Sequence, residues 1–286
     1  MKAEIEVLQP GLFSTIQDPG RFGYLKYGVP MSGPMDSYSF RLANLLLNNP
    51  PGSSAMEITQ MGPVLRFLSG GYLVFTGANL SPQINKIEIR NGMPYVFAPG
   101  DVLSFGTRKT GCRSYLAVSG GFKTEKVLGS QSWYEDITHF YRLQKGMNLE
   151  MNESLVIPAG NASLKVDASR YLETSIQAFP GPEFTKLTEE QVSGISSRSF
   201  RIDKNNNRMA IQLEEIIPNE IKPIITGPVV PGTVQLTPSG KLIVLMRDCQ
   251  TTGGYPRILQ LSENGINRIA QKVQGDPIEF KLLSYP

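Results

Sequence analysis

The sequence is poor in the residues that most often bind metals or form disulfides. Its 286 residues include one histidine, His139, and two cysteines, Cys112 and Cys249. A single histidine excludes a three-histidine zinc site and a His-Glu-x-x-His metalloprotease. The cysteines form no Cys-x-x-Cys pair, which is typical of a protein kept in a reducing cytoplasm. His139 stands near aromatic residues, and we expect it to be an ordinary loop or strand histidine.

Charge and long apolar runs are also scarce. Charged residues make up 19% of the chain, and 28 Lys and Arg against 25 Asp and Glu give a net charge of +3. The basic residues are scattered and form no run of five, so we expect no nucleic-acid partner. No segment approaches the roughly 18 apolar residues that span a membrane, and the amino terminus lacks a signal-peptide pattern. We therefore expect a cytoplasmic protein without a membrane partner.

Signals for nucleotide binding and for biotin attachment are missing as well. The sequence has neither Gly-x-x-x-x-Gly-Lys-Ser/Thr nor Gly-x-Gly-x-x-Gly. A bound ATP would therefore be held without either glycine-rich loop. There is also no Ala-Met-Lys-Met segment of the kind that carries biotin, so we expect no biotin on this chain.

What the sequence does contain is a series of short apolar segments set between 28 Gly and 21 Pro. Turn signals recur about every ten residues, a pattern typical of antiparallel sandwiches and barrels. The fold class we expect is mainly β with few short helices. The expected strands are Glu4–Leu8, Val64–Phe67, Tyr72–Thr76, Lys86–Arg90, Val102–Phe105, Ser114–Val118, Ser175–Phe179, Met209–Leu213, Lys241–Arg247, Arg257–Leu261 and Pro277–Leu283.

The chain length predicts two domains, with one large barrel as the alternative, at roughly 150 residues per domain. The segment Pro99–Phe105 resembles Gln274–Phe280, with a glycine turn followed by apolar alternation, and this favours two related β units. Helices are expected at 37–47, 182–192 and 263–270. For the first of these, Asp36 is expected to cap the helix by accepting a hydrogen bond from the backbone of Ser39.

Two loops are candidates for binding an anion. The first runs through 15–24 and 28–36 into a helix start, where unpaired N–H groups and the positive helix end suit a carboxylate or phosphate. The second, 248–256, has two adjacent glycines whose backbone N–H groups could form an anion-binding concavity. A surface-covering loop and a wide β-turn are the respective alternatives, and both stay open. Arg208 is placed at a strand start and indicates little by itself.

Together these segments resemble one protein family. Its signature is carried by 15–24, 28–36 and 250–256, with Met56–Thr59, Thr76–Leu80, Tyr115–Gly121 and Leu128–Ser130 between them. The sequence is similar to the carboxyltransferase-like family that contains the C subunit of 5-oxoprolinase and allophanate hydrolase subunit 2. That family also includes the antagonist of a sporulation kinase inhibitor and the matching part of urea carboxylase. The resemblance extends over nearly the whole chain.

The resemblance implies two β-barrel-like, cyclophilin-like domains, here 1–172 and 173–286, with exchange of segments allowed. The implied partners are a smaller B subunit, with an A subunit in a 5-oxoprolinase complex. The B and C subunits of such a complex would activate the lactam of 5-oxo-L-proline by phosphorylation, and the A subunit would open the ring to L-glutamate. ATP, with magnesium, would be shared with the partner subunits.

The resemblance also implies site residues, with no metal ligand among them. Candidate catalytic residues are Arg21, Asp36, Arg208 and Thr252. Candidate substrate-binding residues are Gln17, Asp18, Ser32, Gly33, Glu57, Gln250, Thr251, Gly253, Gly254 and Tyr255. We expect the early and late segments to line a common polar cleft.

Departures from the family pattern leave the substrate open. The aromatic segment Trp133–Tyr141 stands where family members often carry a glycine-rich stretch, and Ala210 stands where glycine is usual. Two alternatives to the oxoprolinase subunit therefore remain. One is a non-catalytic protein that antagonises a kinase inhibitor related to the B subunit. The other is a carboxyltransferase component acting on an amide.

Overall fold

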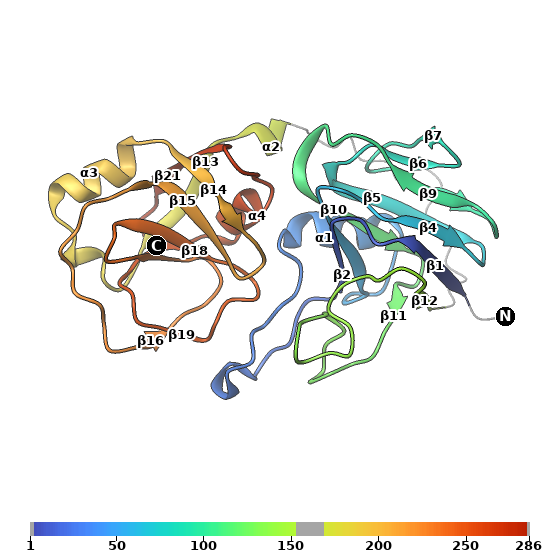
Figure 1. Cartoon of the computed structure of the whole chain (residues 1–286), viewed down its shortest axis with the longest axis horizontal. Coiled ribbons are helices and arrows are strands. Elements are labelled where there is room, and N and C mark those ends of the chain that lie inside the picture. The colour runs from blue at the N-terminus through green and yellow to red at the C-terminus, as the bar shows by residue number, and fades with distance from the viewer. Residues whose placement is uncertain (1–2, 153–168, 285–286) are drawn as a thin grey trace. The chain divides into compact units, whose positions relative to one another are not determined.

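The computed structural model describes residues 3–152 and 169–284 and divides the chain into two compact units (Figure 1). Unit 1 holds Met1–Arg21 and Ser32–Tyr171, and unit 2 holds Phe22–Met31 and Leu172–Pro286. Strands dominate both units, and the described residues contain four α-helices. The expectation of a mainly β protein with few helices is confirmed. No helix in the described ranges is long and apolar enough to cross a membrane.

Unit 1 is built from two sheets. The seven-stranded sheet has the order β11-β12-β1-β4-β9-β6-β7, and the five-stranded sheet has the order β2-β3-β10-β5-β8. The first comprises β1 (Glu4–Gln9), β4 (Val64–Phe67), β6 (Pro82–Ile84), β7 (Ile87–Glu88), β9 (Val102–Phe105), β11 (Phe122–Lys123) and β12 (Asn148–Met151). The second comprises β2 (Phe13–Gln17), β3 (Ala55–Thr59), β5 (Gly71–Asn79), β8 (Tyr95–Phe97) and β10 (Thr110–Val118).

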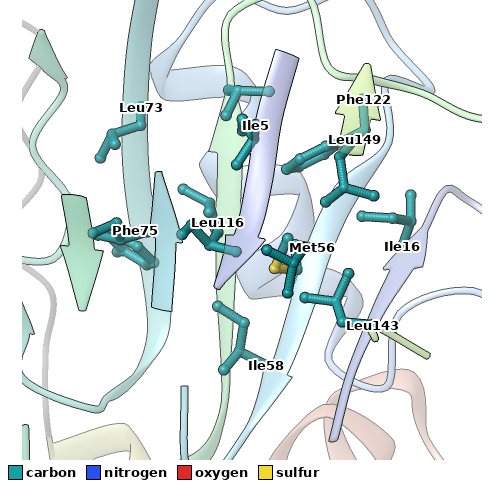
Figure 2. Packing of buried hydrophobic residues seen from close by; sticks show 14 of the residues in the cluster. Ile5, Ile16, Met56, Ile58, Leu73, Phe75, Leu116, Phe122, Leu143 and Leu149 are labelled. Atoms are coloured by element: carbon teal, nitrogen blue, oxygen red, sulfur yellow. The ribbon is translucent and has the colours of Figure 1, made fainter. Parts of the chain in front are cut away.

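The main core of unit 1 lies where the apolar faces of these sheets meet. Alternate residues of a strand point to opposite faces, so Ile5 and Val7 are buried while Glu4 and Glu6 are only partly covered. Figure 2 shows side chains from both sheets, such as Ile5 and Leu116, gathered in this core. Burying each such side chain stabilises the fold by roughly 1.5–3 kcal/mol.

Helix α1 (Ser37–Leu46) covers the other face of the five-stranded sheet. Phe40, Ala43 and Leu46 pack with Val74 and Ala117, which alternate along their strands with the residues of the main core. The cap expected from the sequence is confirmed, because the Asp36 carboxylate accepts from the Ser39 N–H at 3.1 Å. Strand β10 is consequently buried on both faces, and a polar side chain on it must find its partners inside the protein.

Unit 2 is a closed barrel with the order β13-β20-β17-β18-β15-β14-β21. Its strands are β13 (Ser175–Pro180), β14 (Phe200–Asn206), β15 (Ala210–Ile216), β17 (Thr233–Leu236), β18 (Lys241–Leu245), β20 (Arg257–Leu261) and β21 (Pro277–Leu282). The parallel pair of β13 and β21 belongs to this closed ring. A two-stranded sheet of β16 (Gly227–Pro228) and β19 (Thr252–Gly253) is separate from it.

The remaining helices of the described chain are short. They are α2 (Ser169–Leu172), α3 (Glu189–Ser197) and α4 (Glu263–Ile269). Helix α4 agrees with the helix expected at 263–270. The prediction of a helix at 182–192 has the wrong bounds, because α3 begins only at Glu189. Only one 3₁₀ turn, Phe184–Lys186, lies in the first half of the predicted helix. Thr188 is extended and forms a capping box with Gln191, so the α-helix begins after it.

Candidate functional site

Asp18, at the end of β2, binds the segment 130–132 of unit 1 through its carboxylate. Its Oδ1 accepts from the Gly20 N–H at 3.0 Å, from the Ser132 hydroxyl at 2.7 Å and from the Ser130 hydroxyl. Its Oδ2 accepts from the Gln131 N–H at 2.7 Å. Hydrogen bonds to a carboxylate are among the stronger ones in proteins. The carboxylate of Asp18 therefore fixes the segment 130–132 to the end of β2.

Arg21 joins the same segments through its guanidinium. Its Nη1 donates to the Ser32 hydroxyl at 3.1 Å, its Nε to the Val127 carbonyl at 3.4 Å and its Nη2 to the Ser132 carbonyl. The residue is 1% exposed. The planar fork of arginine suits such a junction, because its donors point in fixed directions. Arg21 thus ties Ser32 to the segment 127–132 within unit 1.

The end of β2 is also hydrogen-bonded to Gly33, through Gln17. The side-chain Oε1 of Gln17 accepts from the Gly33 N–H at 3.1 Å, and its Nε2 donates to the Thr15 hydroxyl at 3.0 Å. Gly33 has φ of +85°, and a Cβ there would lie 3.0 Å from the Pro19 carbonyl oxygen. Only glycine adopts this backbone with so close a neighbour. The neighbouring Ser32 also has a positive φ, 55°.

A second network holds the start of α1. The Tyr115 hydroxyl donates to Glu57 Oε2 at 2.7 Å and accepts from the Asp36 N–H at 2.7 Å. The same Glu57 oxygen accepts from the Met35 N–H at 2.8 Å. Asp36 turns its own carboxylate to the Ser39 N–H and hydroxyl. The backbone at the helix start is therefore fixed by a carboxylate and a phenol on neighbouring strands.

Burial keeps the phenol of Tyr115 protonated. Burial, followed by the nearby charges of Glu57 and Asp36, raises the pKa of Tyr115 well above its usual value. The phenol is therefore neutral at pH 7 and serves as a donor. The Glu57 carboxylate has Arg113 Nε at 3.9 Å from Oε1, and both side chains are at most 2% exposed. A buried carboxylate needs such a compensating charge.

The two networks of unit 1 meet at the turn 33–35. Gly33 is held by Gln17 and Met35 by Glu57. The structure thus brings together the candidate residues of unit 1, which are Gln17, Asp18, Arg21, Ser32, Gly33, Asp36 and Glu57, and all of them are buried. Three residues without an expected role, Tyr115, Ser130 and Ser132, complete the networks. The sequence marks Tyr115 as a residue with a polar group inside an apolar strand. It marks Ser130 and Ser132 by a Ser-x-Ser pattern.

In unit 2, Arg208 lies against Asp248. Arg208 Nε donates to Asp248 Oδ2 at 2.7 Å and Nη2 donates to Oδ1 at 3.1 Å, and each residue is 6% exposed. This is the two-pronged geometry that arginine forms with a carboxylate. The carboxylate also neutralises the guanidinium. These two hydrogen bonds hold the chain before β15 against the chain after β18.

The 250–255 loop of unit 2 is the most exposed set of candidate residues. Thr252 and Gly253 form β19 and pair with Pro228 and Gly227 of β16. The carbonyl of Thr251 accepts from the Val229 N–H at 3.1 Å, and that of Gly254 accepts from the Ile224 N–H at 2.9 Å. A Cβ on Gly253 would lie 2.4 Å from the Gln235 amide nitrogen. The remaining candidates, Gln250 and Tyr255, are exposed at its ends.

No group of three or more His, Cys, Asp or Glu side chains within 3–152 and 169–284 could hold a metal ion. The early candidate residues belong to unit 1 and the late ones to unit 2, so their common cleft stays a prediction. A cavity of about 590 Å³ in unit 2 and one of about 330 Å³ in unit 1 are lined by none of the candidate residues.

Comparison with known proteins gives matches over nearly the whole chain. A family model described as carboxyltransferase domain, subdomain A and B, matches residues 27–282. The chain is 30% identical to the C subunit of 5-oxoprolinase from Escherichia coli (strain K12), over 96% of this chain and 90% of that protein. It is also 30% identical to urea amidolyase of Saccharomyces cerevisiae, over 98% of this chain but 17% of that protein. The crystal structure of the Kluyveromyces lactis urea carboxylase superposes with a TM-score of 0.88 at 29% identity, covering 99% of this chain and 28% of that one.

Proposed function

Because the chain belongs to the carboxyltransferase domain family of subdomains A and B, we propose that it is the C subunit of a cytoplasmic, ATP-dependent 5-oxoprolinase. The observation that carries the proposal is the match to the C subunit of 5-oxoprolinase, which is 30% identical over 96% of this chain and covers 90% of that protein. As partners we assign a smaller B subunit together with an A subunit.

The chemistry proposed for the complex starts from a poor electrophile, the lactam of 5-oxo-L-proline. The lactam oxygen forms a bond to the terminal phosphorus of ATP, the bond from that phosphorus to the ADP oxygen breaks, and ADP leaves. Water then adds to the activated carbonyl carbon, the ring C–N bond breaks, and the nitrogen takes up a proton. The acyl phosphate formed in this way is attacked by a second water at its carbonyl carbon, the bond from that carbon to the phosphate oxygen breaks, and phosphate and L-glutamate are released. Such a transfer is favoured by oriented donors around the phosphoryl group.

We assign the buried residues of unit 1 to positioning. Asp18 and Arg21 fix the loops, and Glu57 and Tyr115 fix the backbone before α1, whose positive end favours a negatively charged group. In unit 2, Arg208 is held by Asp248 in the same way. These side chains are engaged within the protein and act through the backbone that they hold.

Direct contact with the substrate is assigned to the 250–255 loop. Thr252 is exposed and carries a hydroxyl that can donate, beside the backbone of Gly253 and Gly254. We assign magnesium and ATP to a site that is shared with the partner subunits. Magnesium at nucleotide sites is held largely by phosphates and water, with one or two carboxylates.

The test is reconstitution with the A and B subunits encoded by the same genome. The complex is given ATP and 5-oxo-L-proline, and glutamate and ADP are measured with and without this chain. We expect both products to depend on this chain and on 5-oxo-L-proline. An assembled complex that hydrolyses no ATP in response to 5-oxo-L-proline contradicts the proposal, and assembly without turnover favours a non-catalytic binding protein.

Thr252→Val separates a catalytic loop from a merely structural one. Removing one transition-state donor lowers turnover roughly 100-fold. Thr110→Val, at the start of β10 in unit 1, is the matched control and should leave turnover unchanged. Full activity of Thr252→Val in an intact complex would remove Thr252 from the proposed site without touching the assignment of the chain to an oxoprolinase.

A second candidate function is carboxyl transfer to an amide. It is favoured by the structural match to the Kluyveromyces lactis urea carboxylase, at a TM-score of 0.88. Such a component would need biotin on another chain. Avidin added to the reconstituted complex distinguishes the two functions, because it blocks carboxyl transfer from biotin and leaves a 5-oxoprolinase active.

A further inference from the structure

The edge of the seven-stranded sheet in unit 1 has a gap. Strand β11 ends at Lys123, which pairs with Glu150 of β12, but β12 continues to Asn148. Beyond Lys123 no further pairing with β12 occurs in the described chain. The Gln131 amide donates to the Thr124 carbonyl at 3.2 Å, and Glu125 Oε1 accepts from the His139 N–H at 2.6 Å. The position opposite Asn148 is therefore left without a strand.

The backbone of Asn148 faces this gap. Successive residues of an antiparallel strand present their N–H and C=O groups to alternate sides. Met151 donates to the Ala3 carbonyl at 2.8 Å and the Met147 carbonyl accepts from Val7 at 2.8 Å, so 147, 149 and 151 face β1. Asn148 and Glu150 face the other side, where Glu150 pairs with Lys123. Within residues 3–152 and 169–284, the N–H and C=O of Asn148 have no backbone partner.

A cavity of about 330 Å³ opens at the same place. Its apolar wall comes from Trp133, Phe140, Met147 and Leu149. The rings of Trp133 and Phe140 are 6.0 Å apart. Thr124 also lines the cavity, and its buried hydroxyl has no hydrogen-bond partner in the described part of the chain. A buried polar atom without a partner costs about 1–3 kcal/mol, so a rotation of the Thr124 side chain that brings its hydroxyl to a ligand in the cavity would be favoured.

We propose that this edge binds an extended segment of a partner protein that continues the sheet where β11 stops. The backbone of the segment pairs with Asn148, and a large apolar side chain next to that position enters the cavity beside Trp133. Leu149 and Trp133 are each 3% exposed, so both side chains are already packed within unit 1. A backbone edge beside an apolar pocket is the arrangement that strand addition uses.

The charged residues around the cavity favour a basic residue in the partner segment, at the position opposite Asn148. Asn148 and Glu150 lie on one face of β12, because side chains alternate along a strand. The side chain opposite Asn148 therefore lies diagonal to Glu150 and close to Glu125, which also lines the cavity. Lys123 is paired with Glu150 at 3.3 Å, so the rim carries an excess of negative charge. The partner segment should alternate basic and large apolar residues.

Trp133 is the only tryptophan of the chain and lines the cavity, so its fluorescence reports binding directly. The probe is the acetylated and amidated peptide Thr-Lys-Leu-Lys-Thr, titrated into the full chain. We expect a saturable shift of the Trp133 emission at peptide concentrations below about 1 mM, a weak affinity typical of a short flexible peptide. Replacing Leu of the peptide by Ala should weaken binding roughly tenfold, the loss expected for an unfilled apolar pocket.

Two controls isolate the backbone pairing. Asn148→Pro removes the N–H that faces the gap and should weaken binding at least tenfold, whereas Asn148→Ala should not change it. A peptide methylated on the backbone nitrogens of its two lysines should bind the unchanged protein equally poorly, which covers the case of a misfolded proline variant. No saturable shift with any peptide overturns the proposal. Equal binding of the methylated peptide also overturns it, and assigns the cavity to small amphipathic molecules instead.

Discussion

Replacing Tyr115 by phenylalanine removes one hydroxyl and leaves two buried partners short of a hydrogen bond. Tyr115 is fully buried, and its hydroxyl joins the Asp36 N–H to the Glu57 carboxylate, at 2.7 Å each. A hydrogen bond to a charged group contributes about 1.5–3 kcal/mol, and an unsatisfied buried N–H costs about 1–3 kcal/mol. We therefore expect Tyr115→Phe to lower the free energy of unfolding by roughly 3–5 kcal/mol.

Urea unfolding followed by the fluorescence of Trp133 measures this loss, because Trp133 lies in the core of unit 1. Tyr95→Phe is the matched control. It also removes a hydroxyl that accepts one backbone N–H, from Arg90 at 2.9 Å, but at an exposed place. Its cost should stay below about 1 kcal/mol. A loss for Tyr115→Phe no larger than that of Tyr95→Phe would refute the role given to the buried network.

Three further predictions concern buried or paired charges. Arg208→Met should cost about 3–5 kcal/mol by stranding Asp248, and the double variant Arg208→Met with Asp248→Leu should regain most of it, as measured by urea unfolding followed by circular dichroism. Burial raises the pKa of Tyr171 from 10.0 to about 12, so the neutral phenol contributes fully to the free energy of unfolding below pH 10. This contribution is lost as the pH rises to 12, and Tyr171→Phe should reduce the loss of stability over that range in urea unfolding. Hydrogen bonds from Arg257 lower the pKa of Glu183 below 4.5, so this pair stabilises the barrel above that pH and is lost on acidification; the stability difference between wild type and Glu183→Gln should shrink as the pH falls through the lowered pKa.

Local patterns in the sequence were sufficient for much of the fold. Asp36 before an apolar stripe predicted the start of α1, and the structure has that cap. The strands Val64–Phe67, Val102–Phe105 and Arg257–Leu261 have the expected bounds. The strand Phe200–Asn206 was missed because only Phe200 and Ile202 are buried and the polar run after them resembles a loop.

The candidate site was predictable as a set of residues but not as a network. Asp18 and Ser132 are 114 positions apart, and no local pattern joins them. Tyr115 lies in a strand that is buried on both faces, so the alternation that marks a half-buried strand is absent there. Its role depends on where α1 packs, which is set by tertiary structure. Polar groups of this kind are found by following buried hydrogen bonds.

The most direct test of lactam activation follows the carbonyl oxygen of 5-oxo-L-proline. The reconstituted complex is given ATP and 5-oxo-L-proline labelled with heavy oxygen at the lactam carbonyl, and the products are analysed by mass spectrometry. Transfer of phosphorus to that oxygen, followed by breakage of its bond to carbon, predicts label in inorganic phosphate and a stoichiometric release of ADP and glutamate. Label that stays entirely in glutamate while ADP is released would contradict it.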